Sequence, residues 1–303
     1  MKLLITGAFK ASNELCEKLS ESGYDLLFLQ DEKADLRGYG IEPSSIDGVI
    51  CNGLFLYSDI KEFSSLKFIQ LTSAGLDRVP LDYIKEHNIK LFNARGVYSV
   101  PMAEYAVCGV LQLYKKSREF FDRQKKCKWE KDRSLLELYG KTVCIAGCGN
   151  VGTECAKRFK AFGCGVIGLD VQVFENREFD KIYPIESIND ILPVSDVLIL
   201  TLPLTEQTEH FIDAERLAVM KSGAVIVNIS RGKVVKESDL ANALKTRLGG
   251  AVLDVFEEEP LSSDSPLWNL SNVNITPHNS FIGDGNAARL EKVIIENLKL
   301  TGN

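Results

Sequence analysis

Short apolar runs alternate with stretches of helical periodicity along the chain, and this alternation limits the fold more than any other feature of the sequence. The first third contains five runs of strand length, KLLITGA, YDLLFLQ, DGVICN, LKFIQLTS and IKLFNA, and the helical stretch SNELCEKLSESG follows the first of them. Repeated strand–helix order is typical of a parallel sheet covered by helices on both faces, so the sequence predicts an α/β fold.

A second strand–helix series begins at KTVCIAG and continues through VIGLD, VLILTLP, AVIVNIS, GGAVLDV and VNITP. One long helical pattern, residues 99–124, separates the two series, and Pro101 near its start removes no helical hydrogen bond. The pattern is apolar in its first half and charged in its second half, as expected of a connection between two domains. One further helix is predicted over the final residues, 283–303.

The composition is ordinary for a globular protein, with 45% hydrophobic residues, 26% charged residues and a formal net charge of −6 in 303 residues. No block of five or more basic residues occurs, which argues against a nucleic-acid surface, because phosphate contacts need clustered Lys and Arg. No segment reaches the roughly 18 apolar residues of a membrane span. The first apolar run is too short for a signal peptide.

The eight cysteines contain no C-x-x-C pair, and several stand inside apolar runs such as TVCIAG and AVCGVL. We therefore expect small buried side chains in a reducing, cytoplasmic compartment. Neither a disulfide framework nor a metal site is expected.

A glycine-rich loop points to a bound dinucleotide. TVCIAGCGNVGTECAKRF places Gly147, Gly149 and Gly152 in the order G-x-G-x-x-G, after an expected strand and at the start of an expected helix. In such a loop the first glycine allows a tight turn, the second lets the backbone approach a pyrophosphate, and the third lets the helix pack on the strand. The helix N-terminus, around Asn150 and Val151, would offer its N–H groups to the phosphates.

The next expected strand, VIGLD, ends at Asp170, 18 residues beyond Gly152. An acid at about this distance hydrogen-bonds the adenosine ribose hydroxyls and repels a 2′-phosphate. Val171 and Gln172 follow, so no arginine stands beside Asp170 to bind such a phosphate. The sequence therefore favours NAD over NADP.

Polar side chains also accompany three later strands. VIVNISRG places Arg231 just past a strand, GAVLDVFEEEP places Asp254 inside one and Glu259 beyond it, and VNITPHNSF places His278 past the last. Ligands of open α/β sheets bind at the carboxyl ends of the strands, so Arg231, Glu259 and His278 are expected to converge there.

Five motifs in order make the chain resemble a known family. GCGNVG with Asp170, LPLTEQT, NISRG, LDVFEEEPL and TPH are together similar to the D-isomer-specific 2-hydroxyacid dehydrogenases, and the resemblance covers essentially the whole chain. It implies two doubly wound parallel-sheet domains with a cleft between them. A flavodoxin-like substrate domain would comprise residues 1–99 plus 279–303, and a Rossmann NAD domain would comprise 100–278. It also implies a small 2-oxo or 2-hydroxy acid substrate, and a homodimer formed through the helix-rich segment 100–140.

The resemblance makes Arg231, Glu259 and His278 the expected catalytic set. Reducing a 2-oxo acid needs a hydride on C2 and a proton on the carbonyl oxygen, and a histidine can supply that proton near neutral pH. Glu259 would favour the imidazolium and fix the ring, while Arg231 can bind the substrate carboxylate with its planar fork. The other two histidines, His87 and His210, have no comparable sequence neighbours and are interpreted as surface or packing residues.

The remaining contacts are also implied by the resemblance. The expected cofactor-binding residues are Gly147, Gly149, Asn150, Val151, Gly152, Asp170, Leu202, Pro203, Thr208, Ile229, Ser230, Arg231, Asp254, His278 and Ser280. Among them, Asp254 would hold the nicotinamide carboxamide. The expected substrate-binding residues are Ser73, Ala74, Gly75, Arg95, Tyr98, Arg231 and His278.

Two alternative functions stay open. An NAD(H)-sensing protein of corepressor type would keep the fold and the catalytic set and act by binding partners, and a relative of the formate dehydrogenases would oxidise formate. Phe281 stands where many relatives have small residues, so the resemblance leaves the shape of the substrate pocket open. For Cys148, inside the glycine loop, the sequence suggests no role beyond small size.

Overall fold

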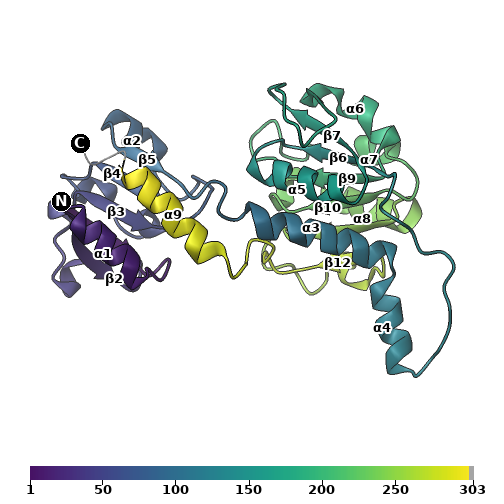
Figure 1. The fold of residues 1–303 in the computed structure, drawn as a ribbon, viewed down its shortest axis with the longest axis horizontal. Coiled ribbons are helices and arrows are strands. Elements are labelled where there is room, and N and C mark those ends of the chain that lie inside the picture. The colour runs from purple at the N-terminus through teal and green to yellow at the C-terminus, as the bar shows by residue number, and fades with distance from the viewer. Residues whose placement is uncertain (300–303) are drawn as a thin grey trace. The chain divides into compact units, whose positions relative to one another are not determined.

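The structure, a computed structural model, describes residues 1–299 and contains two compact units (Figure 1). Unit 1 is Met1–Tyr98 together with the chain from Gly283 onward, and unit 2 is Ser99–Ile282. The predicted last helix is α9, Asn286–Lys299, and its predicted continuation to residue 303 lies outside the described residues.

In the described part of unit 1, five parallel strands form one sheet in the order β2-β1-β3-β4-β5. These strands are β1 (Lys2–Thr6), β2 (Asp25–Leu29), β3 (Gly48–Cys51), β4 (Phe68–Leu71) and β5 (Lys90–Phe92). Helices α1 (Asn13–Glu21) and α9 pack in the same apolar cluster against one face, and α2 (Leu81–Glu86) packs in the cluster of the other face. Figure 1 shows α9 running beside α1, although the two helices lie far apart in the sequence.

Unit 2, all of whose residues are described, contains a seven-stranded parallel sheet in the order β12-β11-β10-β9-β6-β7-β8. Its strands are β6 (Thr142–Ala146), β7 (Gly165–Asp170), β8 (Lys181–Pro184), β9 (Val197–Leu200), β10 (Val225–Asn228), β11 (Gly250–Leu253) and β12 (Val273–Ile275). Its helices are α3 (Ser99–Tyr114), α4 (Ser117–Lys125), α5 (Asn150–Ala161), α6 (Ile188–Ile191), α7 (Ala214–Val219) and α8 (Glu237–Thr246).

The predicted α/β class with two parallel sheets is confirmed. In unit 2, α3 and α5 cover one face of the sheet, and α7 and α8 cover the other, each with its own apolar cluster. The strand order reverses between β6 and β9, which is where open α/β sheets bind their ligands. Strand β8 was not predicted, because KIYP is a short edge strand with only one buried side chain and carries little apolar signal.

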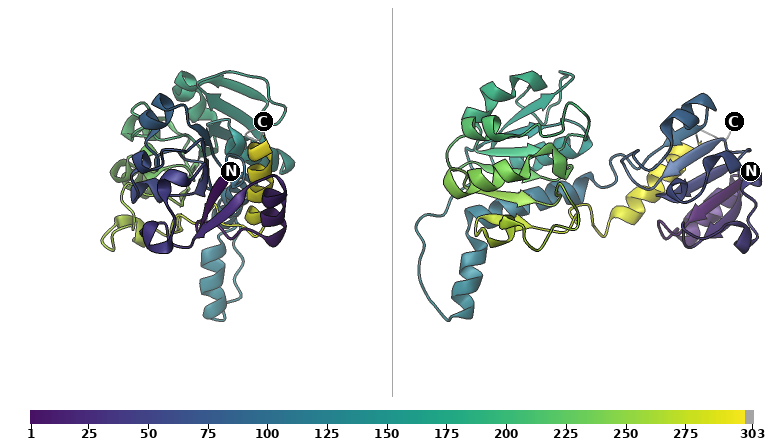
Figure 2. Two further views of the ribbon diagram at one scale, coloured as in Figure 1. Left: turned by 90° about the vertical axis from the view of Figure 1, so that its left-hand side faces the viewer. Right: turned by 180° about the vertical axis from the view of Figure 1, so that it is seen from behind.

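The single helix predicted over residues 99–124 is wrong in its second half. Helix α3 ends at Tyr114, and Lys116 adopts a left-handed backbone conformation with φ 50° before α4 begins. Helix α4 has no buried residue and extends away from the rest of unit 2 (Figures 1 and 2). The apolar face of α3 keeps that helix on the sheet, whereas the charged second half of the pattern has no apolar face to pack.

The cysteines only partly follow the prediction of buried side chains. All eight lie in the described residues and are free, and those at positions 51, 144, 148, 155 and 164 are buried. Cys108 and Cys127 are exposed, which contradicts the prediction. Cys108 stands in the apolar run AVCGVL but on the outer side of α3, because a helix turns successive residues of one run to different faces.

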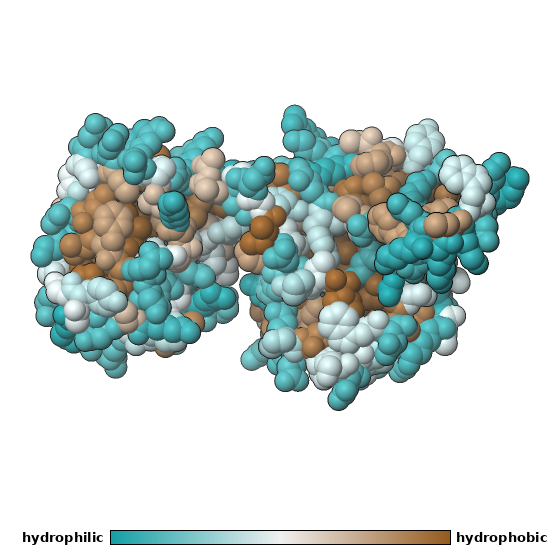
Figure 3. All heavy atoms as spheres, turned by 90° about the horizontal axis from the view of Figure 1, so that it is seen from below, coloured by the Kyte–Doolittle hydropathy of each residue, from teal (hydrophilic) through white to brown (hydrophobic). Residues whose placement is uncertain are grey.

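No helix in the described part of the chain is long and apolar enough to cross a membrane. Hydrophobic side chains also remain on the surface of each unit, among a larger number of polar and charged ones (Figure 3).

The start of β3 supplies a test of core packing in unit 1. A Cβ atom on Gly48 would lie 2.1 Å from Cζ of Phe68, whose ring is buried. Gly48→Ala should therefore lower the free energy of unfolding by about 1–3 kcal/mol, the usual effect of overpacking a core. Chemical denaturation followed by circular dichroism measures this change.

Gly38→Ala is the matched control, because the nearest atom to its added Cβ would be Asp35 Oδ2 at 3.5 Å. Its stability should stay within about 0.5 kcal/mol of the wild type, as is usual for surface substitutions. Equal stability of the two variants would contradict the packing of Phe68 over Gly48.

Candidate active site

The glycine loop follows β6 and leads into α5, at the carboxyl end of the unit 2 sheet. Gly147 has φ 98°, and a Cβ on it would lie 2.9 Å from the backbone of Thr201. A Cβ on Gly152 would lie 2.0 Å from the carbonyl oxygen of Gly147, so the helix packs directly on the turn. Both positions require glycine, and the first N–H groups of α5, from Asn150 and Val151 on, form a ready site for an anion.

Asp170 is the last residue of β7, and its carboxylate lies against the glycine loop. Oδ2 of Asp170 accepts a hydrogen bond of 2.7 Å from the N–H of Cys148, and Oδ1 accepts one of 3.3 Å from Gln172. This contact joins the end of β7 to the loop after β6. Asp170 and the glycine loop therefore lie side by side at the carboxyl end of the sheet, where the predicted cofactor contacts are found.

Cys148 has a packing role that the sequence did not indicate. A Cβ on Gly168 of β7 would lie 2.5 Å from the Sγ atom of Cys148, so this sulfur occupies the space that Gly168 leaves open. Burial raises the pKa of the Cys148 thiol to about 12. The thiol is therefore protonated near neutral pH and acts as a small apolar group.

His278 and Glu259 are in direct contact. Nδ1 of His278 lies 2.8 Å from Oε2 of Glu259, and Oε1 of Glu259 accepts a hydrogen bond of 3.1 Å from the N–H of Phe256. Both side chains are partly exposed. With Nδ1 engaged by the carboxylate, Nε2 is the ring nitrogen that can meet another molecule, which is the arrangement of an oriented acid–base histidine.

The backbone at His278 is held in an uncommon conformation. Its φ is 50°, in the left-handed region that few residues other than glycine adopt. The N–H of His278 donates to the carbonyl oxygen of Asp254 at 2.8 Å, which fixes this turn to the end of β11. The ring of Phe281 meets the His278 ring edge to face, with 6.1 Å between centroids.

Asp254 lies just beyond a strand, not inside one as predicted. Strand β11 ends at Leu253, and Asp254 is the next residue. Its fully buried carboxylate accepts hydrogen bonds from the hydroxyl of Thr276 (2.5 Å) and from the N–H groups of Asn279 (2.7 Å) and Ser280 (2.9 Å). Asp254 therefore holds the turn that presents His278. Its expected contact with a nicotinamide carboxamide stays a prediction.

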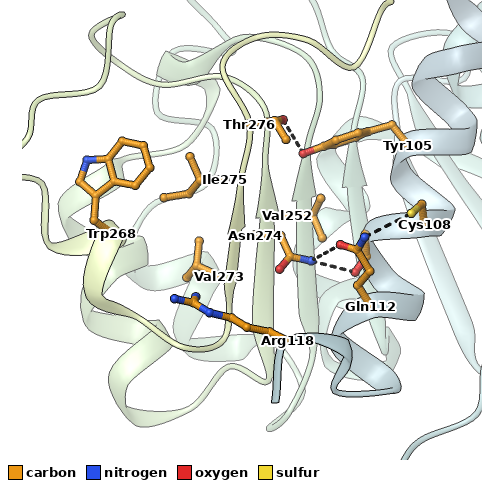
Figure 4. A pocket seen from close by; sticks show the side chains of 11 residues that line it. Tyr105, Cys108, Gln112, Arg118, Val252, Trp268, Val273, Asn274, Ile275 and Thr276 are labelled. Carbon is orange, nitrogen blue, oxygen red and sulfur yellow. Dashed lines mark hydrogen bonds between the residues drawn. The ribbon is translucent and has the colours of Figure 1, made fainter. Parts of the chain in front are cut away.

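Thr276 was not among the predicted site residues, although it belongs to the TPH motif. Its hydroxyl oxygen also lies 2.6 Å from the hydroxyl of Tyr105 on α3 (Figure 4). The two residues line a cavity of about 470 Å³ between α3 and the edge strand β12. None of the described residues that line this cavity is a predicted site residue.

Arg231 is exposed and lies three residues beyond the end of β10. Its Nη1 donates to the carbonyl oxygen of Ser230 at 2.8 Å, and the side chain of Asn228 holds both Ser230 and the carbonyl of Arg231. No acidic side chain in the described part of the chain lies within ion-pair distance of Arg231. The guanidinium can therefore bind an external carboxylate.

The other predicted cofactor contacts follow β9 and β10. Leu202 and Ile229 are buried, and Pro203 is exposed. The hydroxyl of Thr208 donates to the carbonyl oxygen of Pro203 at 2.6 Å and accepts from the N–H of Thr205 at 2.7 Å. These contacts give the loop after β9 a closed turn at the same edge of the sheet.

The predicted substrate contacts of unit 1 also form one group of loops. The hydroxyl of Ser73 donates to the carbonyl oxygen of Gly75 at 3.1 Å. The side-chain amide of Asn93 donates to the carbonyl oxygen of Ala74 at 2.8 Å. Tyr98 donates its hydroxyl to the carbonyl oxygen of Thr72, which precedes this turn. Arg95 is exposed nearby in sequence. Binding of substrate by these residues stays a prediction.

His210, interpreted as a surface or packing residue, is partly exposed and has an acidic partner that its sequence neighbours did not indicate. Its Nε2 lies 3.2 Å from Oε1 of Glu257, two residues before Glu259. His87 is a surface residue as predicted, stacked on Tyr83 with 3.8 Å between ring centroids. Sequence spacing could not reveal the contact between His210 and Glu257, because the two residues lie far apart in the sequence. Among the described residues, no group of three or more His, Cys, Asp or Glu side chains could hold a metal ion.

Comparison with known proteins adds independent information. Residues 107–280 match the family described as D-isomer specific 2-hydroxyacid dehydrogenase, NAD binding domain. The chain is 36% identical to D-3-phosphoglycerate dehydrogenase of Methanocaldococcus jannaschii over 72% of this chain, but spans only 42% of that protein's length. It is 31% identical to (S)-sulfolactate dehydrogenase of Chromohalobacter salexigens over 79% of each chain. The crystal structure of D-lactate dehydrogenase of Aquifex aeolicus, complexed with NAD and lactic acid, superposes with a TM-score of 0.77 at 26% identity, covering 99% of this chain and 96% of that one.

The position of Asp170 leads to a test of cofactor selectivity. Its carboxylate should repel a 2′-phosphate and bind ribose hydroxyls, so Asp170→Ala should raise the ratio of kcat/KM for NADPH to that for NADH by about tenfold or more, the equivalent of ~1.4 kcal/mol. Initial rates with both cofactors, on both proteins, measure this ratio. Glu175→Ala removes an exposed acid five residues later and should leave it unchanged. A wild type that prefers NADPH would contradict this reading.

Proposed function

Because this chain belongs to the D-isomer-specific 2-hydroxyacid dehydrogenases, a family of NAD-dependent oxidoreductases, we propose that it interconverts a D-2-hydroxy acid and its 2-oxo acid. The observation that supports this most is the pairing of His278 with Glu259 at 2.8 Å, on the same sheet edge as the glycine loop. One edge then offers both an oriented acid–base group and an anion-binding helix end.

The loop geometry supports NAD as the cofactor. Gly147 and Gly152 carry no side chains, so the turn after β6 and the start of α5 can pack closely. The carboxylate of Asp170 contacts the same turn. The N-terminus of α5 would bind the pyrophosphate and Asp170 the adenosine ribose. Bound NADH would supply the hydride for C2 of the 2-oxo acid.

His278 is the proposed proton donor in reduction and the base in oxidation. Glu259 accepts a hydrogen bond from the Nδ1–H group of His278, which orients the ring and leaves Nε2 for the substrate oxygen. Arg231 is proposed to bind the substrate carboxylate and to stabilise negative charge on the carbonyl oxygen. Phe281 narrows the space beside His278 and is proposed to influence which substituents on C3 are accepted.

Unit 1 is proposed to contribute further contacts to the substrate, and unit 2 to bind the cofactor. Within unit 1, the loop from Ser73 to Gly75 and the side chains of Arg95 and Tyr98 are the proposed contacts. We also propose a cytoplasmic location, because free and mostly buried cysteines are typical of a reducing compartment.

A homodimer is proposed through α3, α4 and the chain that follows them. Large apolar side chains are exposed along this part of unit 2, including Phe121 at 61%, Trp129 at 99% and Tyr139 at 79% of their surface. Static light scattering should give twice the mass of one chain. Phe121→Lys combined with Trp129→Lys should shift the mass toward that of one chain, whereas Tyr39→Lys, on unit 1, should not. A wild type with the mass of one chain would contradict the dimer.

The central test of this function is a substrate panel with His278→Asn. The wild type should reduce at least one of glyoxylate, hydroxypyruvate, phosphohydroxypyruvate and pyruvate with NADH. The substitution should lower turnover by about a hundred- to ten-thousandfold, the usual contribution of a positioned acid or base. NADH binding, measured by fluorescence titration, should be retained because the glycine loop and Asp170 are unchanged.

His87→Asn is the matched control, because this histidine is on the surface of unit 1. It should leave turnover unchanged. NADH binding without turnover of any 2-oxo acid would favour a sensor of corepressor type, and oxidation of formate alone would favour a formate dehydrogenase. Near-normal turnover by His278→Asn would exclude His278 as the acid–base group.

A further inference from the structure

Two glutamates outside the proposed catalytic set exchange hydrogen bonds. Glu237 is the first residue of α8, which follows the Arg231 segment, and Glu257 lies in the loop that bears Glu259. The N–H of Glu257 donates to Oε2 of Glu237 at 2.6 Å, and the N–H of Glu237 donates to Oε1 of Glu257 at 2.8 Å. Each carboxylate thus accepts a hydrogen bond from the backbone N–H group of the other residue. The two positions are 20 residues apart in sequence, so this exchange joins two separate segments.

The same two segments meet at Gly232, directly after Arg231. A Cβ on Gly232 would lie 1.8 Å from the carbonyl carbon and oxygen of Phe256 and 2.5 Å from the nitrogen of Glu257. The peptide between Phe256 and Glu257 therefore rests on the backbone beside Arg231. Glycine is required at 232 because backbone atoms, which cannot move aside, occupy the space of any side chain.

This peptide is connected on its other side to the proposed acid–base pair. The N–H of Phe256 donates to Oε1 of Glu259 at 3.1 Å, and Oε2 of Glu259 contacts Nδ1 of His278. The N–H of the following residue, Glu257, is held by Glu237. Two successive backbone N–H groups are thus bound by two carboxylates: that of Phe256 by Glu259, and that of Glu257 by Glu237. Because Glu237 holds this peptide, the orientation of Glu259 depends on Glu237.

A third segment joins at His210. Its Nε2 lies 3.2 Å from Oε1 of Glu257, and its N–H donates to the carbonyl oxygen of Lys233 at 2.6 Å. Burial, with the neighbouring Glu257 as a further cause, raises the pKa of Glu237 above its usual value. A pair of carboxylates is costly to bring together, which is why the two backbone N–H groups and the imidazole are needed as partners.

We propose that Glu237 and Glu257 are positioning residues that set the distance and orientation between Arg231 and the Glu259–His278 pair. The proposal rests on the proposed function, because it assigns these two glutamates a role in that reaction. Neither residue needs to touch the substrate. A small displacement of a catalytic group is enough, since a misplacement of about 1 Å can cost on the order of a hundredfold in rate.

The experiment compares Glu237→Ala with Glu237→Gln. The glutamine keeps an oxygen acceptor for the N–H of Glu257, whereas the alanine removes it. Glu237→Ala should lower kcat for the best 2-oxo acid by about ten- to a hundredfold, with KM for NADH within about twofold of the wild type. Glu237→Gln should recover most of the loss. Glu257→Ala, which removes the reciprocal acceptor, should change kcat in the same direction.

Glu215→Ala is the matched control, because Glu215 also lies in the first turn of a helix, α7, but is exposed. It controls for the loss of an acid at a helix N-terminus. Its kcat should equal that of the wild type. A thermal midpoint that falls in Glu237→Ala while kcat is unchanged would overturn the proposal and leave a purely structural role. A Glu237→Gln as impaired as Glu237→Ala would also overturn it.

Amide hydrogen exchange separates this proposal from the proposed function. The amides of residues 256–259 should exchange slowly in the wild type and faster in Glu237→Ala, whether or not any substrate is turned over. A wild type without turnover on the panel would contradict the proposed function alone. Exchange that is unchanged by Glu237→Ala would contradict the positioning role even in an active enzyme.

Discussion

The buried carboxylate of Asp254 is the interaction on which the rest of the candidate site depends. It accepts three hydrogen bonds from residues 276–280, and the carbonyl of the same residue binds the N–H of His278. An unpartnered carboxylate at a fully buried position would be strongly unfavourable, so the turn and the acid require each other. The left-handed backbone of His278 is maintained by these bonds.

A second set of contacts places Arg231 relative to that turn. Gly232 lies against the backbone of Phe256, and the exchange between Glu237 and Glu257 closes the same junction. The segments after β10 and β11 are therefore bound to each other by backbone groups, not by flexible side chains alone. Groups held in this way lose little further freedom when a substrate binds, which is the physical basis of preorganised catalysis.

Much of this arrangement could be predicted from local sequence. Strand-length apolar runs and helical periods indicate parallel sheets, and the strict needs of a tight turn make Gly147 and Gly152 recognisable. Arg231, Glu259 and His278 could be selected because polar residues at the carboxyl ends of parallel strands meet at one edge. The roles of Thr276, Glu237 and Glu257 were not predicted. The sequence around a threonine before a proline, or around one acid among several, does not indicate which distant group it will hydrogen-bond.

By itself, the sequence determined the α/β class, the glycine loop with Asp170, and the strand ends that bear the proposed catalytic residues, since periodicity and turn chemistry are local properties. Only the tertiary structure decided that Asp254 follows β11 and holds the His278 turn, that His210 meets Glu257, and that the helical pattern of residues 99–124 breaks at Lys116. These features depend on which distant segments pack together and on which helix faces the sheet can bury. That information is absent from the spacing of residues along the chain.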